Sequence, residues 1–102
     1  RALRLVERGE GGAARLALDS LVGLAAPASA ARAEALWWRA VLAADAADAE
    51  RDYRTITADH ASSPRAAESW LRLAQLALLR GRPGQAEVEL DRLLVAQPDT
   101  PA

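Results

Sequence analysis

The residues Glu68–Pro98, ESWLRLAQLALLRGRPGQAEVELDRLLVAQP, decide the fold of this chain. Apolar and small side chains recur at helical spacing on both sides of a short break, so each half predicts an amphipathic helix with one buried face. The break contains Gly81, Pro83 and Gly84, which end one helix and turn the chain. The stretch therefore predicts two helices packed as an antiparallel hairpin. The positions with this spacing are Trp70, Leu73, Ala74 and Ala77 in the first half, and Ala86, Leu90, Leu93 and Leu94 in the second.

The beginning of the chain repeats the spacing of this stretch. Gly9, Ala14, Leu18 and Leu21 have the same mutual spacing as Gly81, Ala86, Leu90 and Leu93. Self-similarity at a fixed spacing is typical of arrays of helical hairpins. The first copy lacks the start of its first helix, and Ala26–Pro27 closes its second helix.

A weaker copy lies in the middle of the chain. Its first helix, near 30–45, has Leu36, Ala40 and Ala43 at bulky, small and bulky positions, and its second has Ala49, Tyr53 and Ile56. This copy fits only if its turn is about three residues shorter than in the standard helical-hairpin repeat. We therefore expect an all-α array of about three antiparallel hairpins, at 1–27, 29–63 and 64–98. The expected helices are 1–8, 12–25, 30–45, 48–60, 64–80 and 84–96, with no strand.

The composition agrees with an all-α domain and argues against several kinds of binding site and structural feature. The 102 residues suit one small domain rich in Ala, Leu, Arg and Glu. The net charge of −1 gives no basic surplus for nucleic acid or anionic lipid, and the absence of Cys excludes disulfides and thiolate sites. No apolar run approaches the roughly 20 residues that span a bilayer. The chain opens at Arg1 inside an expected helix, so we expect a fragment of a longer chain.

The sequence also predicts which residues cap the helices. Ser29 is expected to cap the helix that follows it, and Ser62 or Ser63 the helix that begins at Pro64. The acidic run DAAD at 45–48 replaces glycine in the middle turn, and Asp48 is expected to cap the next helix.

The motif of the last hairpin resembles the tetratricopeptide repeat, a helix–turn–helix unit of about 34 residues. Trp70, Leu73 with Ala74, Ala86, Leu90 and Pro98 match its aromatic, Leu–Gly, small, aromatic and proline positions. Ala74 stands for the family's Gly and Ala77 for its usual Tyr. The resemblance implies an α-solenoid that binds protein partners without catalysis. The junction SSPRAAES also resembles that of envelope members from Gram-negative bacteria, which implies a periplasmic location, with the cytoplasm as the alternative.

The side chains that could take part in catalysis or metal binding are better explained by structural roles. His60 lies near a helix end and has no assembled nucleophile or metal-ligand set. The run Asp45, Asp48, Glu50 and Asp52 lacks the glycine and terminal glutamate of a calcium loop, so we expect a solvated helix start. Ser62–Ser63 has no partner base, and Gly9–Gly12 lacks the Lys–Ser/Thr of a phosphate loop. We expect no catalytic, cofactor or metal site.

The tryptophans divide between core and contact roles. Trp70 is expected in the core. Trp37 and Trp38 point about 100° apart on a helix, so at least one is expected at a hairpin interface or on the open surface, where exposed Trp serves partner binding.

The tetratricopeptide resemblance also implies an inner wall, formed by the first helix of each hairpin, that binds a partner. The wall is mainly apolar and lacks the basic set with which some members hold a carboxyl terminus. An apolar segment of a protein partner is therefore the expected ligand. The alternatives are a structural accessory subunit of a larger complex, and an enzyme whose catalytic domain lies outside these residues. The residues expected on the wall are Leu3 and Val6 in the first unit, Glu34, Trp37 and Val41 in the second, and Glu68, Leu71, Gln75 and Leu78 in the third.

Overall fold

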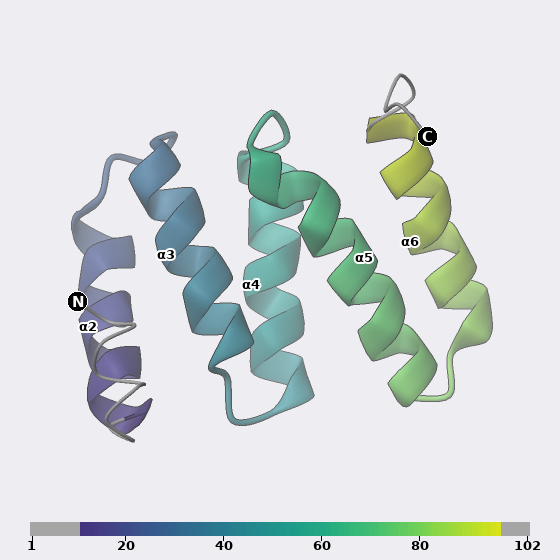
Figure 1. Cartoon of the computed structure of the whole chain (residues 1–102), viewed down its shortest axis with the longest axis horizontal. Helices are drawn as coiled ribbons and strands as arrows, with labels where there is room; N and C mark the ends of the chain where they lie inside the picture. Colours follow the sequence, from purple (N-terminus) through teal and green to yellow (C-terminus); the bar gives the residue numbers. More distant parts are fainter. Residues whose placement is uncertain (1–10, 97–102) are drawn as a thin grey trace.

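The computed structural model describes residues 11–96, and this part of the chain is all-helical (Figure 1). Each helix packs on the next in chain order, and α3 also contacts α5 directly. None of these helices combines the length and hydrophobicity needed to cross a membrane. The segment expected as a helix at 1–8 lies outside the described residues. The helices are α2 (Gly11–Leu24), α3 (Ala30–Val41), α4 (Ala46–Asp59), α5 (Pro64–Leu79) and α6 (Pro83–Ala96).

Side-chain caps begin three of these helices. Ser29 accepts a hydrogen bond from the Arg32 backbone N–H, and Ser63 accepts one from Arg65, with Pro64 in the first turn of α5. Both predictions are confirmed, with Ser63 chosen over Ser62. These side chains satisfy backbone donors that have no partner within the helix.

The cap of α4 differs from the expectation. Asp45, not Asp48, is the cap, and its Oδ1 accepts the Asp48 N–H at 2.9 Å. As a result α4 begins at Ala46, two residues early, and the helix expected over 30–45 ends at Val41. Asp48 instead lies in the first turn, where its charge faces the positive end of the helix.

The end of α5 depends on the backbone of Gly81, which has φ of 71°. This left-handed conformation lets the Arg82 N–H donate to the Ala77 carbonyl at 2.8 Å and the Gly81 N–H donate to the Leu78 carbonyl at 3.0 Å. The pair of bonds is a Schellman motif, which satisfies the last carbonyls and turns the chain into α6.

The helices enclose a central core between α3, α4 and α5. Within it, the rings of Trp37 and Tyr53 meet edge to face, with centroids 5.3 Å apart and an interplanar angle of 61°. A smaller cluster of Ala74, Ala77 and Ala86 lies where α5 crosses α6. Small side chains there let the two helix backbones approach closely. The central core consists of Leu36, Trp37, Ala40, Ala49, Tyr53, Ile56 and Leu73.

Burial shows how the middle hairpin corresponds to the last one. Buried residues of α3–α4 recur 37 positions later in α5–α6, as in the pairs Leu36 and Leu73, Trp37 and Ala74, Ala40 and Ala77, and Ala49 and Ala86. The expected shortening of the middle turn is wrong, since residues 42–45 form a turn of four residues against three at 80–82. The shorter element is α3 itself, with 12 residues against 16 in α5.

The outer side of α6 also departs from the expectation. Leu90 and Leu94 were expected in the core, yet Leu90 is 40% exposed and Leu94 more so. Tyr53, the equivalent of Leu90 in α4, is only 5% exposed. The physical reason is that α5 covers α4, whereas among residues 11–96 the only helix that packs against α6 is α5, on its inner side.

The Gly81 turn gives a first prediction. Gly81→Ala should lower the free energy of unfolding by about 1–2 kcal/mol, because a Cβ disfavours positive φ. Gly84→Ala, in the first turn of α6, is the matched control and should be neutral or stabilising by up to about 1 kcal/mol. A Cβ at either position meets no atom within 4 Å, so steric contact cannot explain a difference. Equal urea midpoints for the two variants would contradict the role of Gly81.

The crossing of α5 and α6 gives a second prediction. Ala86 is buried in the small-residue cluster, so Ala86→Leu should overpack the crossing and cost about 1–3 kcal/mol. Ala13→Leu and Ala28→Leu change exposed positions and should leave the melting temperature nearly unchanged. Thermal unfolding followed by circular dichroism measures all three. A melting temperature for Ala86→Leu equal to that of the original protein would show that Ala86 does not lie at the contact between α5 and α6.

Candidate functional site

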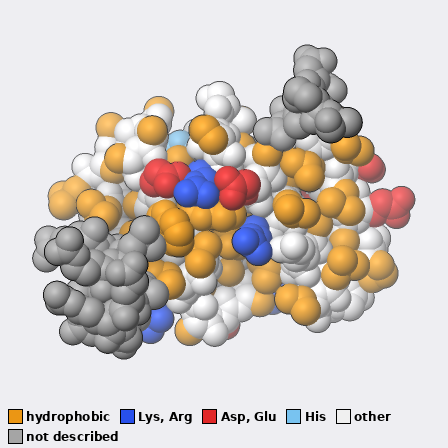
Figure 2. All heavy atoms as spheres, viewed as in Figure 1, with side chains coloured by type: hydrophobic (Ala, Val, Ile, Leu, Met, Phe, Trp, Pro, Cys, Tyr) orange, Lys and Arg blue, Asp and Glu red, His pale blue; other side chains and the backbone are white. Residues whose placement is uncertain are grey.

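Most of the expected inner-wall residues that the structure describes are exposed on α3 and α5. In Figure 1 these two helices lie in front of α4, and Figure 2 shows the same face with acidic and basic side chains meeting among hydrophobic ones. We refer to the surface between α3 and α5, which includes a pocket lined by both helices, as the α3–α5 groove. Leu3 and Val6 lie outside the described residues. The expected wall residues that are exposed on this face are Glu34, Val41, Glu68, Leu71, Gln75 and Leu78.

Trp37 does not line the groove as expected. Its side chain is 3% exposed and belongs to the central core, so it is not available to a partner. The reason is that the sequence comparison aligned the middle unit with the last hairpin three residues out of register. It matched Trp37 with exposed Leu71, whereas the structural equivalent of Trp37 is buried Ala74. Trp38 and Trp70 are half-buried and pack against the same core, so each of these two aromatic residues lies at a helix interface.

Arg65 closes one end of the groove. Its guanidinium donates to both carboxylate oxygens of Glu34 across the groove, at 2.6 and 3.0 Å, and to Glu68 on its own helix at 3.3 Å. Its guanidinium carbon also lies 4.8 Å from the centroid of the Trp37 ring. The hydrogen bond from Arg65 lowers the pKa of Glu34. The two acids expected at the rim are therefore paired within the protein.

The other end of the groove opens into a pocket of about 360 Å³. It lies between the end of α3, the beginning of α4 and the second half of α5. Val41 and Gln75, both expected on the wall, are among its lining residues. Sequence reasoning did not foresee the remaining lining, because it comes from three helices that only the fold brings together. Those residues include Tyr53, Arg72, Leu76 and Leu79.

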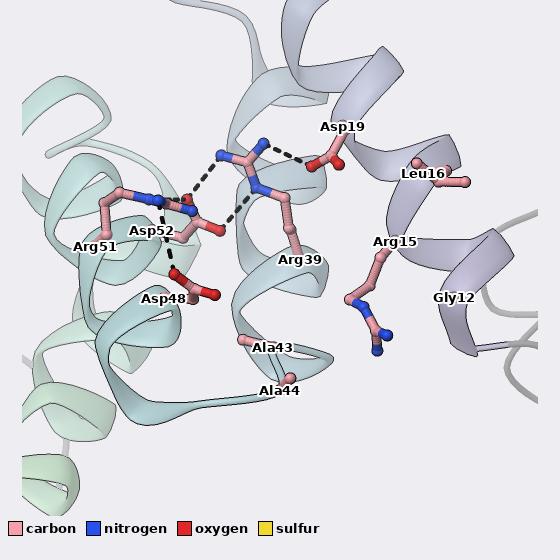
Figure 3. Close-up of a pocket in the computed structure, with 10 residues that line it drawn as sticks. All are labelled: Gly12, Arg15, Leu16, Asp19, Arg39, Ala43, Ala44, Asp48, Arg51 and Asp52. Atoms are coloured by element: carbon pink, nitrogen blue, oxygen red, sulfur yellow. Dashed lines mark hydrogen bonds and ion pairs between the residues drawn. The ribbon is translucent and has the colours of Figure 1, made fainter.

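A second pocket, of about 390 Å³, lies between α2, α3 and α4 and is strongly charged (Figure 3). Arg39 is at its centre and donates to both oxygens of Asp52 at 2.8 Å and to Asp19 of α2 at 3.0 Å. Figure 3 shows Arg39 reaching between these two carboxylates, which come from different helices. These bonds, opposed by burial, raise the pKa of Arg39. The cluster thereby joins α2, α3 and α4.

The charge of Asp52 is buried, contrary to the expectation of a solvated helix start. Its side chain is 2% exposed, and the bidentate contact with Arg39 compensates the lost hydration. Glu50 is also partly shielded and accepts hydrogen bonds from Arg54 and Arg80. Only Asp45 and Asp48 of the acidic run keep the expected role at an exposed helix start.

Two further buried polar groups have structural roles. Glu89 of α6 accepts hydrogen bonds from Arg54 of α4 at 2.8 Å and from Gln85 at 2.5 Å, and sequence reasoning missed it. His60 ends α4 and is buried, with its Nε2 3.0 Å from a guanidinium nitrogen of Arg32. Because guanidinium nitrogens only donate, Nε2 acts as the acceptor in this contact.

The groups on this surface that remain available to a ligand are mainly apolar. Glu34 and Glu68 are paired with Arg65, which leaves Val41 at the pocket, and Leu71 and Leu78 on α5, as exposed apolar side chains. No protein-family model, curated protein or solved structure matches the chain. The functional conclusion therefore depends on the groove itself.

The buried ion pair gives a third prediction. Asp52→Asn removes the main partner of Arg39, which keeps its contact with Asp19 and is 23% exposed. The free energy of unfolding should therefore fall by about 1–3 kcal/mol, the range for hydrogen bonds to a charged group. Asp48→Asn is the matched control on the same helix, because its ion pair with Arg51 is long, at 3.7 Å, and exposed. It should cost no more than about 1 kcal/mol. Urea unfolding measures both.

A double variant separates the charge from the packing. In Arg39→Met with Asp52→Leu, no charge is left buried, so stability should recover most of what Asp52→Asn loses. A double variant less stable than Asp52→Asn would show that the hydrogen bonds, and not charge compensation, dominate here.

Proposed function

We propose that this chain is a non-enzymatic protein-interaction or scaffold module of the tetratricopeptide type, which binds an apolar segment of a protein partner in the α3–α5 groove. The observation that carries the proposal is the row of exposed apolar side chains on this face. Val41, Leu71 and Leu78 are 43%, 42% and 58% exposed. Exposed apolar side chains that gather on one face beside polar groups are typical of protein-binding sites.

The tetratricopeptide proposal is supported by the recurrence between hairpins. The same burial pattern returns after 37 residues, close to the family's repeat of about 34, and small residues lie at the crossing of α5 and α6. The direct contact of α3 with α5 is also consistent with first helices that stack into one wall.

The groove suits an amphipathic helix or an extended segment with large apolar side chains. Its floor is the central core, since Trp37 and Tyr53 lie directly below the face. A rigid floor lowers the conformational entropy lost on binding, and each apolar side chain buried adds roughly 25 cal/mol per Å².

The setting that we propose is the bacterial periplasm. It rests on the likeness of the Ser-Ser-Pro junction to envelope proteins, and on its use here, where Ser63 caps α5 and Pro64 begins it. The alternative location is the cytoplasm. Fusion of the full-length gene to a reporter that is active only after export tests the proposal.

A second candidate function is that of a structural accessory subunit fixed in a larger complex. The uncovered outer side of α6 favours it, because this helix presents several large apolar side chains to solvent. They are Val88, Leu90, Leu94 and Val95.

The groove can be tested with a phage-displayed library of random 12-residue peptides. The original protein should enrich peptides with large apolar residues, and Val41→Ser with Leu71→Ser should abolish that enrichment while the helical signal persists. Loss of a buried apolar contact at an interface typically weakens binding by tenfold or more. Trp37→Ala does not suit this test, because it removes a core residue at about 3–5 kcal/mol.

The matched control is Leu24→Ser with Val95→Ser, which changes two exposed apolar residues on α2 and α6. This variant should enrich the same peptides as the original protein. If the control loses binding and the groove variant keeps it, the accessory-subunit function with a contact on α6 becomes the better conclusion.

A further inference from the structure

The two arginines that α5 presents to the groove differ in their partners. Arg65 is fully engaged by Glu34 and Glu68. Arg72, about two turns later, makes one side-chain hydrogen bond among residues 11–96, to the side-chain oxygen of Gln75 at 3.3 Å. Among residues 11–96, no carboxylate oxygen lies within ion-pair distance of Arg72. The groove therefore contains one cation that the described part of the chain does not neutralise.

The position of Arg72 places this charge at the mouth of the apolar pocket. Its guanidinium carbon lies 5.8 Å from the centroid of the Trp37 ring, and the residue lines the pocket together with Tyr53. Burial raises the pKa of Tyr53, and the positive charge of Arg72 opposes that shift, so the charge acts on the floor of the pocket. A cation beside buried aromatic rings attracts an anion more strongly than a fully solvated one does.

Asp45 is the acid among the lining residues of this pocket, and its charge is already used. Its Oδ1 accepts the Asp48 N–H at the beginning of α4, where the helix dipole stabilises a negative charge. Arg72 is therefore the charged group in this lining that has neither an ionic partner nor a helix end to balance it.

We propose that the segment bound in the α3–α5 groove carries an Asp or Glu side chain next to a large apolar residue. The carboxylate pairs with Arg72, and the apolar side chain enters the pocket beside Val41, Leu76 and Leu79. Arginine and carboxylate form two parallel hydrogen bonds, which fix the register of the segment in the groove. This inference rests on the proposed function and names the chemistry of the partner.

The carboxylate belongs to a side chain within the segment and not to a chain end. The pocket continues past Arg72 along α5 to Gln75 and Leu79, so a segment that fills it extends beyond the arginine. A single negative charge also suits the site better than a phosphate, because the carboxylate of Asp45 lines the same pocket and repels a second charge.

The test uses the peptide library with three proteins: the original, Arg72→Gln, and Arg92→Gln as the matched control on the exposed part of α6. The original and Arg92→Gln should enrich Asp or Glu within two positions of Leu, Ile, Phe or Trp. Arg72→Gln should keep the apolar preference and lose the acidic one. Circular-dichroism melting curves of the three proteins should coincide, since Arg72 has no ionic partner to lose among residues 11–96.

A second measurement uses one selected peptide, synthesised with a blocked amino end and a carboxyl-terminal amide. Arg72→Gln should weaken its binding by about ten- to hundredfold, the range for a hydrogen bond to a charged group, and Arg72→Lys should restore part of the loss. Replacing the peptide's acid by its amide should weaken binding to the original protein equally, and should have no further effect on Arg72→Gln.

The outcomes separate this inference from the proposed function. Apolar peptides that need Val41 and Leu71 but show no acidic preference would overturn the inference and leave the proposed function standing. The same follows if Arg92→Gln weakens binding as much as Arg72→Gln, or if binding requires a free carboxyl terminus. If no enriched peptide depends on Val41 and Leu71, the proposed function itself fails.

Discussion

The buried carboxylate of Asp52 requires its ion pair with Arg39, which also links three helices. A carboxylate that is 2% exposed is stable only with a partner charge and satisfied oxygens, and Arg39 supplies both in a bidentate contact. Because Arg39 also reaches Asp19, one guanidinium sets the relative positions of α2, α3 and α4. The equivalent position in the last hairpin, Glu89, is again a buried acid paired with an arginine. We infer that these acids fix the register between neighbouring helices, since a slip would leave a charge unpaired.

The register of α3 in turn creates the groove. It turns Trp37 inward against Tyr53, so the face between α3 and α5 has an aromatic floor in place of an exposed anchor. Two arginines of α5 lie over that floor, and their partners decide their roles. Arg65 closes one end through Glu34, whereas Arg72 remains available beside the pocket at the other end. This face thus combines exposed apolar side chains with one arginine that no carboxylate pairs among residues 11–96, and the specificity that we propose rests on that combination.

The sequence by itself determined the elements that depend on neighbouring residues. Caps at Ser29 and Ser63, the Pro64 start and the Gly81 turn involve contacts within a few residues, so local patterns identify them. Helical spacing of small and apolar residues likewise predicted an all-helical chain, and the burial of Ala86, because a helix face is a property of its own sequence. The wall residues of α5 are exposed for the same reason, whereas their role in binding stays a prediction.

Only the tertiary structure decided which helix faces are buried and which neighbouring helix buries them. The burial of Asp52 and Glu89 needs guanidinium groups 13 and 35 residues away, which spacing along one helix cannot reveal. Leu90 has the same local pattern as Tyr53, yet it is exposed because no following helix covers it among residues 11–96. Trp37 was wrongly placed on the exposed wall because the middle hairpin is shorter than the last one. The sequence does not show whether the three absent residues belong to the turn or to the beginning of the first helix. Each of these features depends on contacts between helices, and those contacts exist only once the helices have packed.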